Sequence, residues 1–574
     1  MDAGSLSPSL TRSRTRSVSR TATKGPPRVF HINPSSGHLG NDGSAASPWR
    51  TLAEVAAALL PSNVTGSGRD ASVSYGPRTA SSFLRLMPGD TLVLYRGYHG
   101  AVSIVGSNFP RDVHVRAARG HSACVRGLSF AWSSHWRVSG LTVSARCTPP
   151  GHPDATVGSA SRTLTGVTID RQSTAASHHV TITGCLMYGG MVTTGWSEDN
   201  WQYTVADVAV FGPHNTLIGN HVLNGGGVQV GFSSPYAYVA WNSIENIVAD
   251  GIGQKSHYGT FEYNFIANSR KVNDNHNDLF QGWASVGNVL RGNILRAFSN
   301  PKQSFLADST LGLSDTQGIG LFDGWFDNWL IEDNQVFVDH TIGIWIQGGR
   351  GCTVRRNIVS RCGQRVWNSY RPAGIRVDAR KTGQVSAGTM AHCIDYHCRV
   401  NCDDHPPPTC PVPLAFVAGN IVTDNQAENF ELPPEGGVVT NDGNTKAPCN
   451  GYALTRLGLK NVNGDGASCT SDPRYRTGVT YDADGYVVPG RGSVRVPVVD
   501  VVYVEGYGAD VVWDASGVGV DGVVGRGFDV YCEGEWVGRT RAAGASVFWH
   551  SAFESIGPCA FEAYAVYAID ANVS

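Results

Sequence analysis

An asparagine that recurs at intervals of about 22 residues, interrupted by longer loops before Asn293 and Asn334, is the feature that most restricts how this chain can fold. The recurring positions are Asn220, Asn242, Asn264, Asn293, Asn334 and Asn357. The first three are 22 residues apart, and the last two are 23 residues apart. A repeat of about 22 residues predicts a solenoid, in which each repeat forms one coil that stacks on the next.

The residues beside these asparagines are typical of strands. Gly, Asn, Val and Ile dominate segments such as NSIENI (242–247) and NWLIEDN (328–334), whereas helical repeats are longer and rich in Ala, Leu and Glu. Asparagine tolerates the left-handed conformation of a tight bend and can stack its amide on the coil above. The sequence therefore predicts a parallel β-helix. It also predicts that four isoleucines share the core: Ile244, Ile266, Ile294 and Ile358.

Segments near the N-terminus resemble the right-handed parallel β-helix family related to pectate lyases. FHINPSSGHLGNDGSAASPWRTLAEV (30–55) and PGDTLVLYRGY (88–98) are similar to its opening strand, Gly/Asn/Asp turn, helix start and PGDT strand. HWRVSGLTV (135–143) is similar to one coil of that family. The apolar stretch Thr51–Leu60 is too short to span a membrane and predicts a helix that caps the first coil.

The resemblance continues to the far end of the solenoid. SDPRY (471–475) and DADGYVVPGRGS (482–493) are similar to the last strand and the cover of the family. The resemblance thus implies a right-handed parallel β-helix over residues 29–494, with an irregular cover at 426–494. Because the family includes lyases, hydrolases, epimerases and fibre proteins, the resemblance implies no single activity.

The last part of the chain, residues 498–574, has a different pattern. Alternating strands such as GFDVYCEGEWVGRT (527–540) and FEAYAVYAIDANVS (561–574) resemble a fibronectin type III or immunoglobulin-like domain. We therefore expect an all-β chain in which a right-handed parallel β-helix solenoid is followed by a small β-sandwich.

The first 28 residues are basic, and Asp2 is their only acidic residue. The basic positions are Arg12, Arg14, Arg16, Arg20, Lys24 and Arg28. A disordered, solvated tail is the favoured interpretation, and nuclear import, packaging or phosphate contact are the alternatives. The whole chain has 45 basic and 47 acidic residues, a net charge of −2, so we expect no nucleic-acid binding by the main domains. No apolar run of signal-peptide or membrane-span length follows Met1, which suggests a protein exported by another route or carried on a virus particle.

The thirteen cysteines are not spread evenly. Four of them lie with three histidines in a Cys-rich loop at residues 392–410. The loop contains Cys393, Cys398, Cys402 and Cys410 with His392, His397 and His405. Their spacing does not repeat the paired CxxC of common zinc sites, so it favours disulfides over a zinc knot. Cys532 and Cys559 form a plausible separate bridge.

Six strands that share a pattern predict a groove along the solenoid. Side chains alternate faces along a strand, so the apolar second position points inward and the third points outward. One outward row is then Gln229, Gly253, Gln281, Gly320, Trp345 and Arg376. The next outward row is Gly231, Lys255, Trp283, Phe322, Gln347 and Asp378. Aromatic rings, amides and charges separated by glycines are typical of a sugar-binding groove, although a slip of one residue would turn these rows inward. Ordinary surface is the alternative interpretation.

The densest polar cluster lies where one of these strands begins. Asp274, His276 and Asp278 precede the strand, and Asp250 occupies the matching place one coil earlier. Coils stack about 4.8 Å apart, so Asp250 and Asp278 should lie close together and act as an acid and a base, or hold calcium. Turn capping is the alternative role for these residues.

These residues predict a protein that binds a polysaccharide and also modifies it. A β-elimination lyase would use Lys255, His276 or Arg376 with the carboxylates, whereas a hydrolase would use Asp250, Asp278 and Asp323. Substrate contacts are expected from Gln229, Gln281, Trp283, Trp345, Gln347 and Asp378. The chain lacks the GHG-plus-paired-Asp pattern of polygalacturonases and the WxDH stretch of pectate lyases. A non-catalytic glycan-binding surface, fibre or virion protein is the competing hypothesis.

Overall fold

The computed structural model describes most of the predicted solenoid. The described residues are 27–60, 86–118, 123–149, 167–169, 177–189, 201, 208–270, 277–297, 316–338, 340–361, 373–378, 418–432 and 437–446, with the backbone of further strands at 63–65, 72–74 and within 479–566. The basic tail up to residue 26 and the Cys-rich loop 392–410 lie outside the described residues. The predicted roles of both segments therefore stay predictions.

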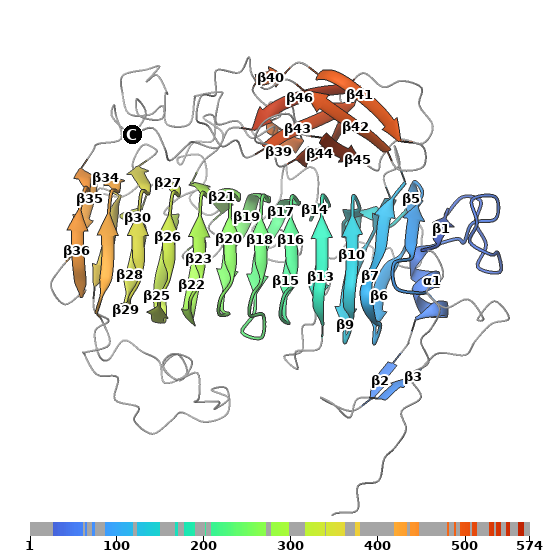
Figure 1. The fold of residues 1–574 in the computed structure, drawn as a ribbon, viewed down its shortest axis with the longest axis horizontal. Helices are drawn as coiled ribbons and strands as arrows, with labels where there is room; N and C mark the ends of the chain where they lie inside the picture. The colour runs from blue at the N-terminus through green and yellow to red at the C-terminus, as the bar shows by residue number, and fades with distance from the viewer. Residues whose placement is uncertain are drawn as a thin grey trace, which may run out of the picture.

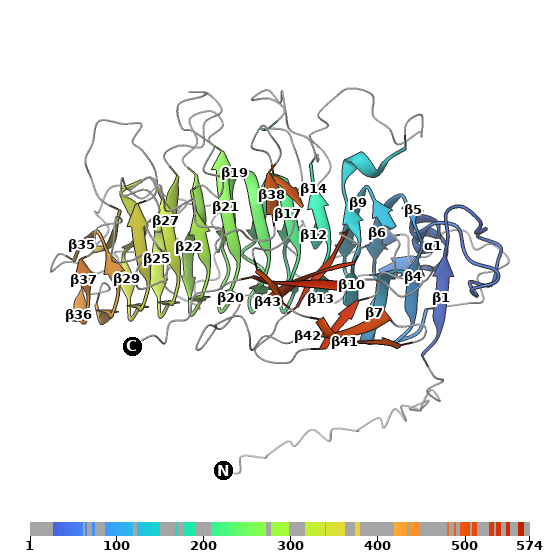
Figure 2. The ribbon, with the colours of Figure 1, turned by 90° about the horizontal axis from the view of Figure 1, so that it is seen from above.

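Two long sheets, in which every strand pairs in parallel with its neighbours, form the body of the protein (Figures 1 and 2). The 13-stranded sheet contains β1 (Val29–Ile32), β4 (Thr91–Leu94), β7 (Asn108–Ala117), β10 (Ser134–Ser139), β13 (His178–Thr183), β16 (Thr216–Ile218), β18 (Tyr238–Ala240), β20 (Thr260–Glu262), β23 (Val289–Arg291), β26 (Leu330–Glu332), β30 (Thr353–Arg355), β33 (Asn420–Thr423) and β36 (Val438–Asp442). Strand order follows chain order along this sheet, as it does when a chain winds in successive coils.

The 22-stranded sheet forms the other walls of the coils. Its strands are β5 (Gly97–Tyr98), β6 (Ala101–Val105), β8 (Ala123–Val125), β9 (Gly127–Ala131), β11 (Thr142–Val143), β12 (Val167–Ile169), β14 (Leu186–Tyr188), β15 (Val208–Val210), β17 (His221–Val230), β19 (Ser243–Gln254), β21 (Phe265–Arg270), β22 (Asp278–Val286), β24 (Ile294–Arg296), β25 (Gln317–Asp327), β27 (Gln335–Val338), β28 (Ile342–Gln347), β29 (Gly349–Arg350), β31 (Ile358–Arg361), β32 (Gly374–Asp378), β34 (Gln426–Ala427), β35 (Asn429–Glu431) and β37 (Thr445–Lys446). The predicted parallel β-helix is confirmed.

The recurring asparagines form a continuous buried ladder. In each pair, Nδ2 of one asparagine donates to Oδ1 of the asparagine on the next coil, at 2.9–3.0 Å. The ladder runs through Asn220, Asn242, Asn264, Asn293, Asn334, Asn357, Asn425 and Asn444, two positions more than the sequence suggested. The left-handed backbone expected for these asparagines belongs instead to the residue before each, such as Tyr263 with φ 56°.

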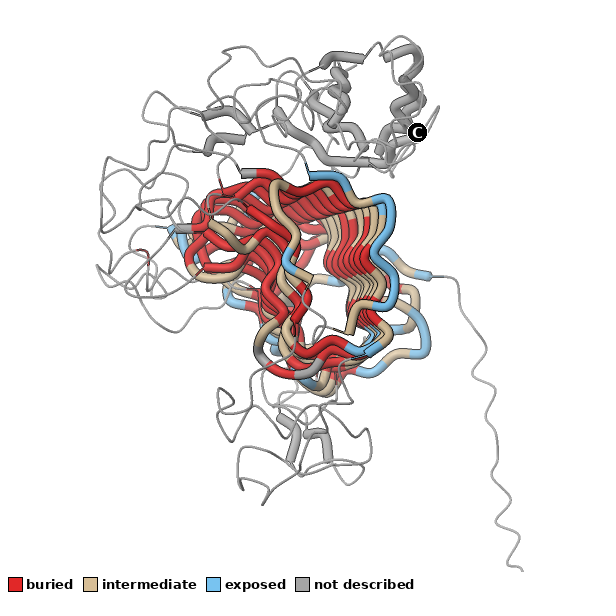
Figure 3. The backbone as a smooth tube through the Cα atoms, turned by 90° about the vertical axis from the view of Figure 1, so that its left-hand side faces the viewer, coloured by how far each residue is buried: buried red, intermediate tan, exposed pale blue. Residues whose placement is uncertain are grey.

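The core lies inside the coils, where successive strands place apolar side chains in register (Figure 3). One stack contains Val222, Ile244, Ile266, Leu295, Val336 and Val359. The predicted inward positions of Ile244 and Ile266 are therefore confirmed, but those of Ile294 and Ile358 are wrong. Both lie directly after their asparagine rather than two residues after it, and one residue reverses the face of a side chain. Ile294 packs in a separate cluster with Phe265 and Ala267, and Ile358 is partly exposed.

The N-terminal end of the solenoid is closed by helix α1 (Leu52–Leu59), as predicted. The Thr51 side chain caps this helix by accepting a hydrogen bond from the Glu54 amide at 3.3 Å. Leu52 and Val55 are buried in the main core. A short helix η2 (Ala145–Cys147) and the antiparallel pair β2 (Asn63–Thr65) and β3 (Ser72–Ser74) lie outside the two long sheets. No helix in the described ranges is long and apolar enough to cross a membrane.

One disulfide, Cys124–Cys147, joins neighbouring coils and was not foreseen from the sequence. Within the described ranges, the free thiols belong to Cys185 and Cys352, both buried. Burial raises the pKa of each to about 12, so both are unreactive at neutral pH. The side chains of Cys532 and Cys559 lie outside the described residues, so their bridge stays a prediction.

The backbone after residue 478 pairs in antiparallel ladders, unlike the solenoid. β38 (Val479–Tyr481) pairs with β39 (Val487–Pro489). A four-stranded sheet contains β40 (Val494–Val496), β43 (Gly527–Cys532), β44 (Glu535–Thr540) and β46 (Phe561–Val566). A three-stranded sheet contains β41 (Val498–Val504), β42 (Gly508–Trp513) and β45 (Val547–His550). The small β-sandwich stays a prediction.

Candidate functional site

The structure places the first predicted outward row in register. The paired positions are Gln229, Gly253, Gln281, Gly320, Trp345, Arg376 and, one coil further, Glu431. The flanking positions point into the core, as the buried residues Ile252 and Phe280 show. We call this outward row, together with the residues that follow it on each strand, the groove face.

The second predicted row is in register only in part. Gln347 pairs with Asp378, as expected. Trp283, however, pairs with Asp323 rather than with Phe322, because the register between β22 and β25 shifts after Gly282. An extra residue in one strand of a pair produces such a shift and turns the side chains that follow.

Two of the predicted site residues, Lys255 and Trp283, meet on neighbouring coils. The Lys255 ammonium lies 4.3 Å from the centroid of the Trp283 ring and 5.7 Å from that of Phe232. Phe232 is 46% exposed, so it offers ring surface to solvent. Among the residues that the structure describes, no carboxylate lies within ion-pair distance of Lys255. This ammonium is therefore held by two aromatic rings and remains available to a ligand.

A second cluster surrounds Trp345 further along the groove face. Its indole Nε1 donates to Asp378 Oδ1 at 3.0 Å, and the Arg376 guanidinium lies 4.5 Å from the ring centroid. Arg376 Nε donates to Asp378 Oδ2 at 2.6 Å, and its Nη1 lies 3.3 Å from Glu431 Oε2. Phe322 approaches Trp345 at 5.6 Å between centroids. Arg376 is thus paired with two carboxylates, unlike Lys255.

Asp250 and Asp278 lie together, as their positions in the repeat indicated. The backbone N–H of Asp278 donates to Asp250 Oδ1 at 3.2 Å. Asp278 is fully buried, whereas Asp250 is half-buried. A Cβ on Gly320 would come within 2.8 Å of Asp278 Oδ1, so only glycine at this position leaves room for the carboxylate. At Gly253 a Cβ would lie 2.4 Å from Gln229 Oε1, so a larger residue there would displace the Gln229 amide.

For four other predicted site residues the structure shows how far each side chain is buried. Gln281 and Asp378 are buried, and Gln229 and Gln347 are half-buried. His276 and the side chain of Asp323 lie outside the described residues. The catalytic and substrate-binding roles assigned from the sequence therefore stay predictions.

A metal site was one expectation for this region. In the described part of the chain, no group of three or more His, Cys, Asp or Glu residues is placed to hold a metal ion. Calcium binding by Asp250 and Asp278 would need ligands from elsewhere, and it stays a prediction.

Two residues of the groove face were missed by the sequence analysis: Phe232 and Glu431. Phe232 directly follows the strand that ends near Gly231, so its place beside Lys255 follows from the register. Glu431 lies on a strand outside the six from which the groove was predicted, so the sequence pattern did not predict that it pairs with Arg376.

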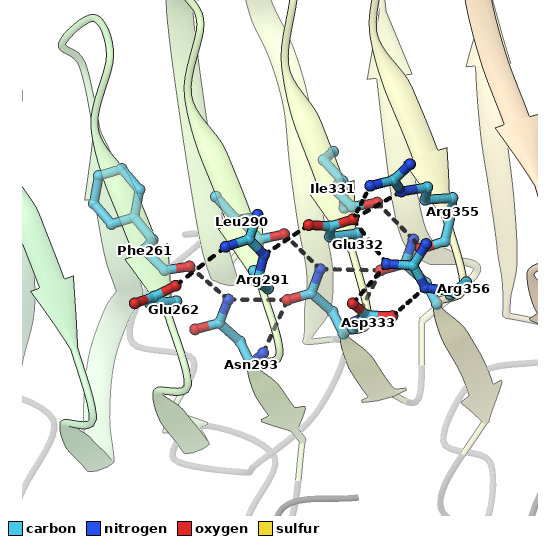
Figure 4. A network of polar contacts seen from close by, with 12 residues as sticks. Phe261, Glu262, Leu290, Arg291, Asn293, Ile331, Glu332, Asp333, Arg355 and Arg356 are labelled. Carbon is cyan, nitrogen blue, oxygen red and sulfur yellow. Dashed lines mark hydrogen bonds and ion pairs between the residues drawn. The ribbon is translucent and has the colours of Figure 1, made fainter. Parts of the chain in front are cut away.

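The outer face of the 13-stranded sheet carries a different arrangement (Figure 4). Arg291 lies between Glu262, at 3.6 Å, and Glu332, at 2.6 Å. Glu332 also bonds Arg355 at 2.6 Å and Arg356 at 2.9 Å, and Arg356 bonds Asp333 at 2.7 Å. We call these six residues the charge ladder: Glu262, Arg291, Glu332, Asp333, Arg355 and Arg356. Its three positive and three negative charges pair with one another across neighbouring coils.

No family model and no curated protein matches the chain. Among solved structures, the chain is similar to the Dettilon tailspike protein, with 13% identity, a TM-score of 0.35, and coverage of 83% of this chain and 88% of that one. It is also similar to the lacto-N-biosidase from Eubacterium ramulus, with 12% identity, a TM-score of 0.38 and coverage of 73% and 68%. For pectate lyase Pel9A the identity is 12%, the TM-score 0.35 and the coverage 82% and 96%. The sequence identities and TM-scores are low, and the fold assignment rests on the strand pairing described above.

Proposed function

We propose that the protein binds a polysaccharide along the groove face and modifies it there. One observation carries this proposal: positions on six successive coils lie in register along a single line, and they include two amides, an indole ring and a guanidinium separated by glycines. Coils about 4.8 Å apart repeat such groups along the axis, as an extended polymer requires. A folded ligand of small size would need a closed pocket instead.

The groups on this face suit sugars. The exposed ring of Phe232 and the ring of Trp283 provide flat apolar surfaces for the faces of sugar rings. The side-chain amides of Gln229 and Gln347 can donate to and accept from hydroxyl groups. Lys255, between the two rings, supplies a positive charge for an oxygen-rich substituent.

The proposed chemistry rests on Asp250, Asp278 and Lys255. In a hydrolase, one carboxyl group protonates the leaving oxygen and the other activates water or attacks the sugar. In a lyase, a basic group removes a proton from the sugar, and Lys255 or His276 would take that role. The complete burial of Asp278 favours the second candidate function, binding without modification, because a catalytic carboxylate must reach its substrate.

A panel of uronate and neutral polysaccharides separates these alternatives. The absorbance of new unsaturated ends and the concentration of new reducing ends are measured together. Unsaturated ends indicate a lyase, reducing ends alone indicate a hydrolase, and binding without either indicates a glycan-binding protein. A chelator in a parallel series tests the proposed calcium.

Variants connect any activity or binding to the groove face. Trp283→Ala should weaken binding by about 1 kcal/mol, because it removes one aromatic face. Asp278→Asn and His276→Ala should each abolish turnover if the face is catalytic. Thr260→Ala, on the outer face of the other sheet, is the matched control and should change nothing. Unchanged binding in Trp283→Ala would contradict the proposal.

A further inference from the structure

Five ring side chains stack along one edge of the 13-stranded sheet. The stacked pairs are His135–His179 (4.9 Å between centroids), His179–His214 (5.0 Å), His214–Tyr236 (4.9 Å) and Tyr236–Tyr258 (5.4 Å). Each of the five residues has a left-handed backbone, with φ between 54° and 62°. We call them the ring ladder. His135 and His179 are the second residues of β10 and β13, and His214, Tyr236 and Tyr258 lie two residues before β16, β18 and β20.

Because the rings stack on one another, the inner rings of the ring ladder can offer a binding partner their edges but not their faces. His179, His214 and Tyr236 each have a neighbouring ring on both faces. At the far end, a Cβ on Gly287 would lie 2.6 Å from the Tyr258 ring, so this ring covers the glycine of the next coil. His179 and His214 are nevertheless exposed, and Tyr236 and Tyr258 are 49% and 37% exposed. Charge and hydrogen bonds along the ring edges are therefore what this surface offers.

The histidine end concentrates groups that gain a proton in mild acid. His178 lies beside the ladder, with its Nδ1 2.8 Å from Nδ1 of His179. Burial, followed by the charges of His135 and His214, lowers the pKa of His178. Burial also lowers the pKa of His179, with contributions from His178, His135 and His214, and Asp112 opposes this shift. These imidazoles are therefore neutral at pH 7 and become charged below their ordinary pKa of 6.5.

The strands packed against the histidine end add positive charge. On β7 the basic groups are Arg111, His114 and Arg116, which lie beside the carboxylate of Asp112, and on β10 the charged neighbour of His135 is Arg137. Arg137 and Arg116 lower the pKa of His114 after burial does so, and Asp112 raises it. On β7, β10, β13 and the described bends before β16 and β18, Asp112 is the only carboxylate. Protonation of His178 and His179 would thus add positive charge to a surface on which Asp112 is the one described carboxylate.

We propose that the histidine end of the ring ladder is a second binding site, which takes a linear anionic polysaccharide in mildly acidic solution. An anionic chain that lies along the solenoid axis would meet a ladder histidine on each of three successive coils, beside Arg137. The negative charges of the ligand favour the charged imidazoles, so binding and protonation reinforce each other. Single-stranded nucleic acids bind by stacking their bases on open ring faces, and the inner rings of this ladder have none.

The test measures binding of heparin to the full-length protein at pH 5.5 and pH 7.5, at low salt. We expect binding at least about tenfold tighter at pH 5.5, weakening steeply as salt is added. The triple variant His135→Asn, His179→Asn and His214→Asn should lose this gain. Asparagine adopts the left-handed conformation more readily than most residues, so the bends should be retained. Far-ultraviolet circular dichroism and the melting temperature of the variant verify that the coils are intact.

The control is the pair Tyr236→Phe and Tyr258→Phe, which keeps the stacking and changes no charge near pH 6. Its heparin binding should match that of the unaltered protein at both pH values. Equal affinity at pH 5.5 and 7.5, or unchanged binding by the triple variant, would overturn the proposal. Equally tight binding of a single-stranded oligonucleotide at pH 5.5 would overturn the assignment to polysaccharides. Loss of groove binding through Trp283→Ala should leave this heparin response intact, so the two proposals fail separately.

Discussion

The charge ladder and the groove face lie on the same coils but use the repeat in opposite ways. In the charge ladder, Arg291, Arg355 and Arg356 all bond Glu332 or its neighbours across the coils (Figure 4). On the groove face, Lys255 lies between two aromatic rings and has no carboxylate partner in the described ranges. The charges of the charge ladder are paired with one another, whereas Lys255 on the groove face remains available to a ligand.

The difference follows from which residues occupy successive coils. A repeat of about 4.8 Å brings equivalent side chains into contact, so opposite charges on adjacent coils neutralise each other. Glycine on alternate coils, as at Gly253 and Gly320, instead gives the neighbouring side chains room to lean along the sheet. The same scaffold therefore supports one face whose charges are paired with one another and another face that carries Lys255 between aromatic rings.

The largest effect should come from the core that supports both faces. Ile266→Asp places a charge in a fully packed interior, and we expect a loss of about 4 kcal/mol or more in the free energy of unfolding. Urea denaturation followed by circular dichroism measures this loss. Ile358→Asp is the matched control, because its side chain is partly exposed, and it should cost much less. Similar losses in the two variants would contradict the assigned register.

A smaller loss is expected from the asparagine ladder. Asn264 donates to the Val239 carbonyl at 2.9 Å and to Asn293 at 3.0 Å, and it accepts from Asn242 at 3.0 Å. Asn264→Ala leaves these buried groups without partners and should cost about 2–3 kcal/mol. The same change at Asn444, at the end of the ladder, should cost less. A cost at Asn444 as large as that at Asn264 would argue against a ladder that is strongest at its centre.

Glu332→Gln tests whether the charge ladder stabilises the fold. Burial raises the pKa of Glu332, but hydrogen bonds and charges from Arg291 and Arg355 outweigh it, and the net shift is downward. Because three arginines of the network are partly exposed, solvent screening limits the expected cost to about 1 kcal/mol at pH 7.

The pH dependence of this cost has a defined sign. A lowered pKa in the folded state gives stability that is present above the ordinary value of 4.5 and is lost as the pH falls through the folded pKa. The difference between the variant and the unaltered protein should therefore vanish in strong acid. Urea midpoints measured from pH 7 to pH 3 test this, and a constant difference would contradict it.

The smallest effect on stability should come from Lys255→Gln on the groove face. This ammonium contacts two rings but no carboxylate among the described residues, so its loss should change the free energy of unfolding by about 0.5 kcal/mol or less. Glycan binding should nevertheless weaken. Paired measurements on Lys255→Gln and Glu332→Gln sharpen the comparison of the two faces. A larger stability loss for Lys255→Gln than for Glu332→Gln would mean that the groove face, and not the charge ladder, contributes more to stability.

The coil arrangement could be predicted because two local signals agree. The asparagine spacing gives the length of a coil, and the alternation within strands gives the inward positions, so the register from Val228 to Ile375 follows from the sequence. Ile294 and Ile358 were misplaced because they follow their asparagines directly, and a shift of one residue reverses the face.

The disulfide and the ring ladder also have signals in the spacing of their residues in the sequence. Cys124 and Cys147 are separated by 23 residues, about one coil, which places them on neighbouring coils. His214, Tyr236 and Tyr258 repeat at intervals of 22 residues, as the first asparagines do. The irregular pairing of Trp283 with Asp323 could not be predicted, because it depends on how β25 bends between two coils.

The asparagine ladder also makes the stacking of the coils independent of the number of residues that connect them. Its side-chain bonds measure 2.9–3.0 Å whether the two asparagines are 22, 41 or 68 residues apart in sequence. Each coil is closed by the same bonds, so a long excursion between two coils leaves the stack undisturbed. Loops of different lengths can therefore connect successive coils, and surface segments can be gained or exchanged without a change in the framework of stacked coils.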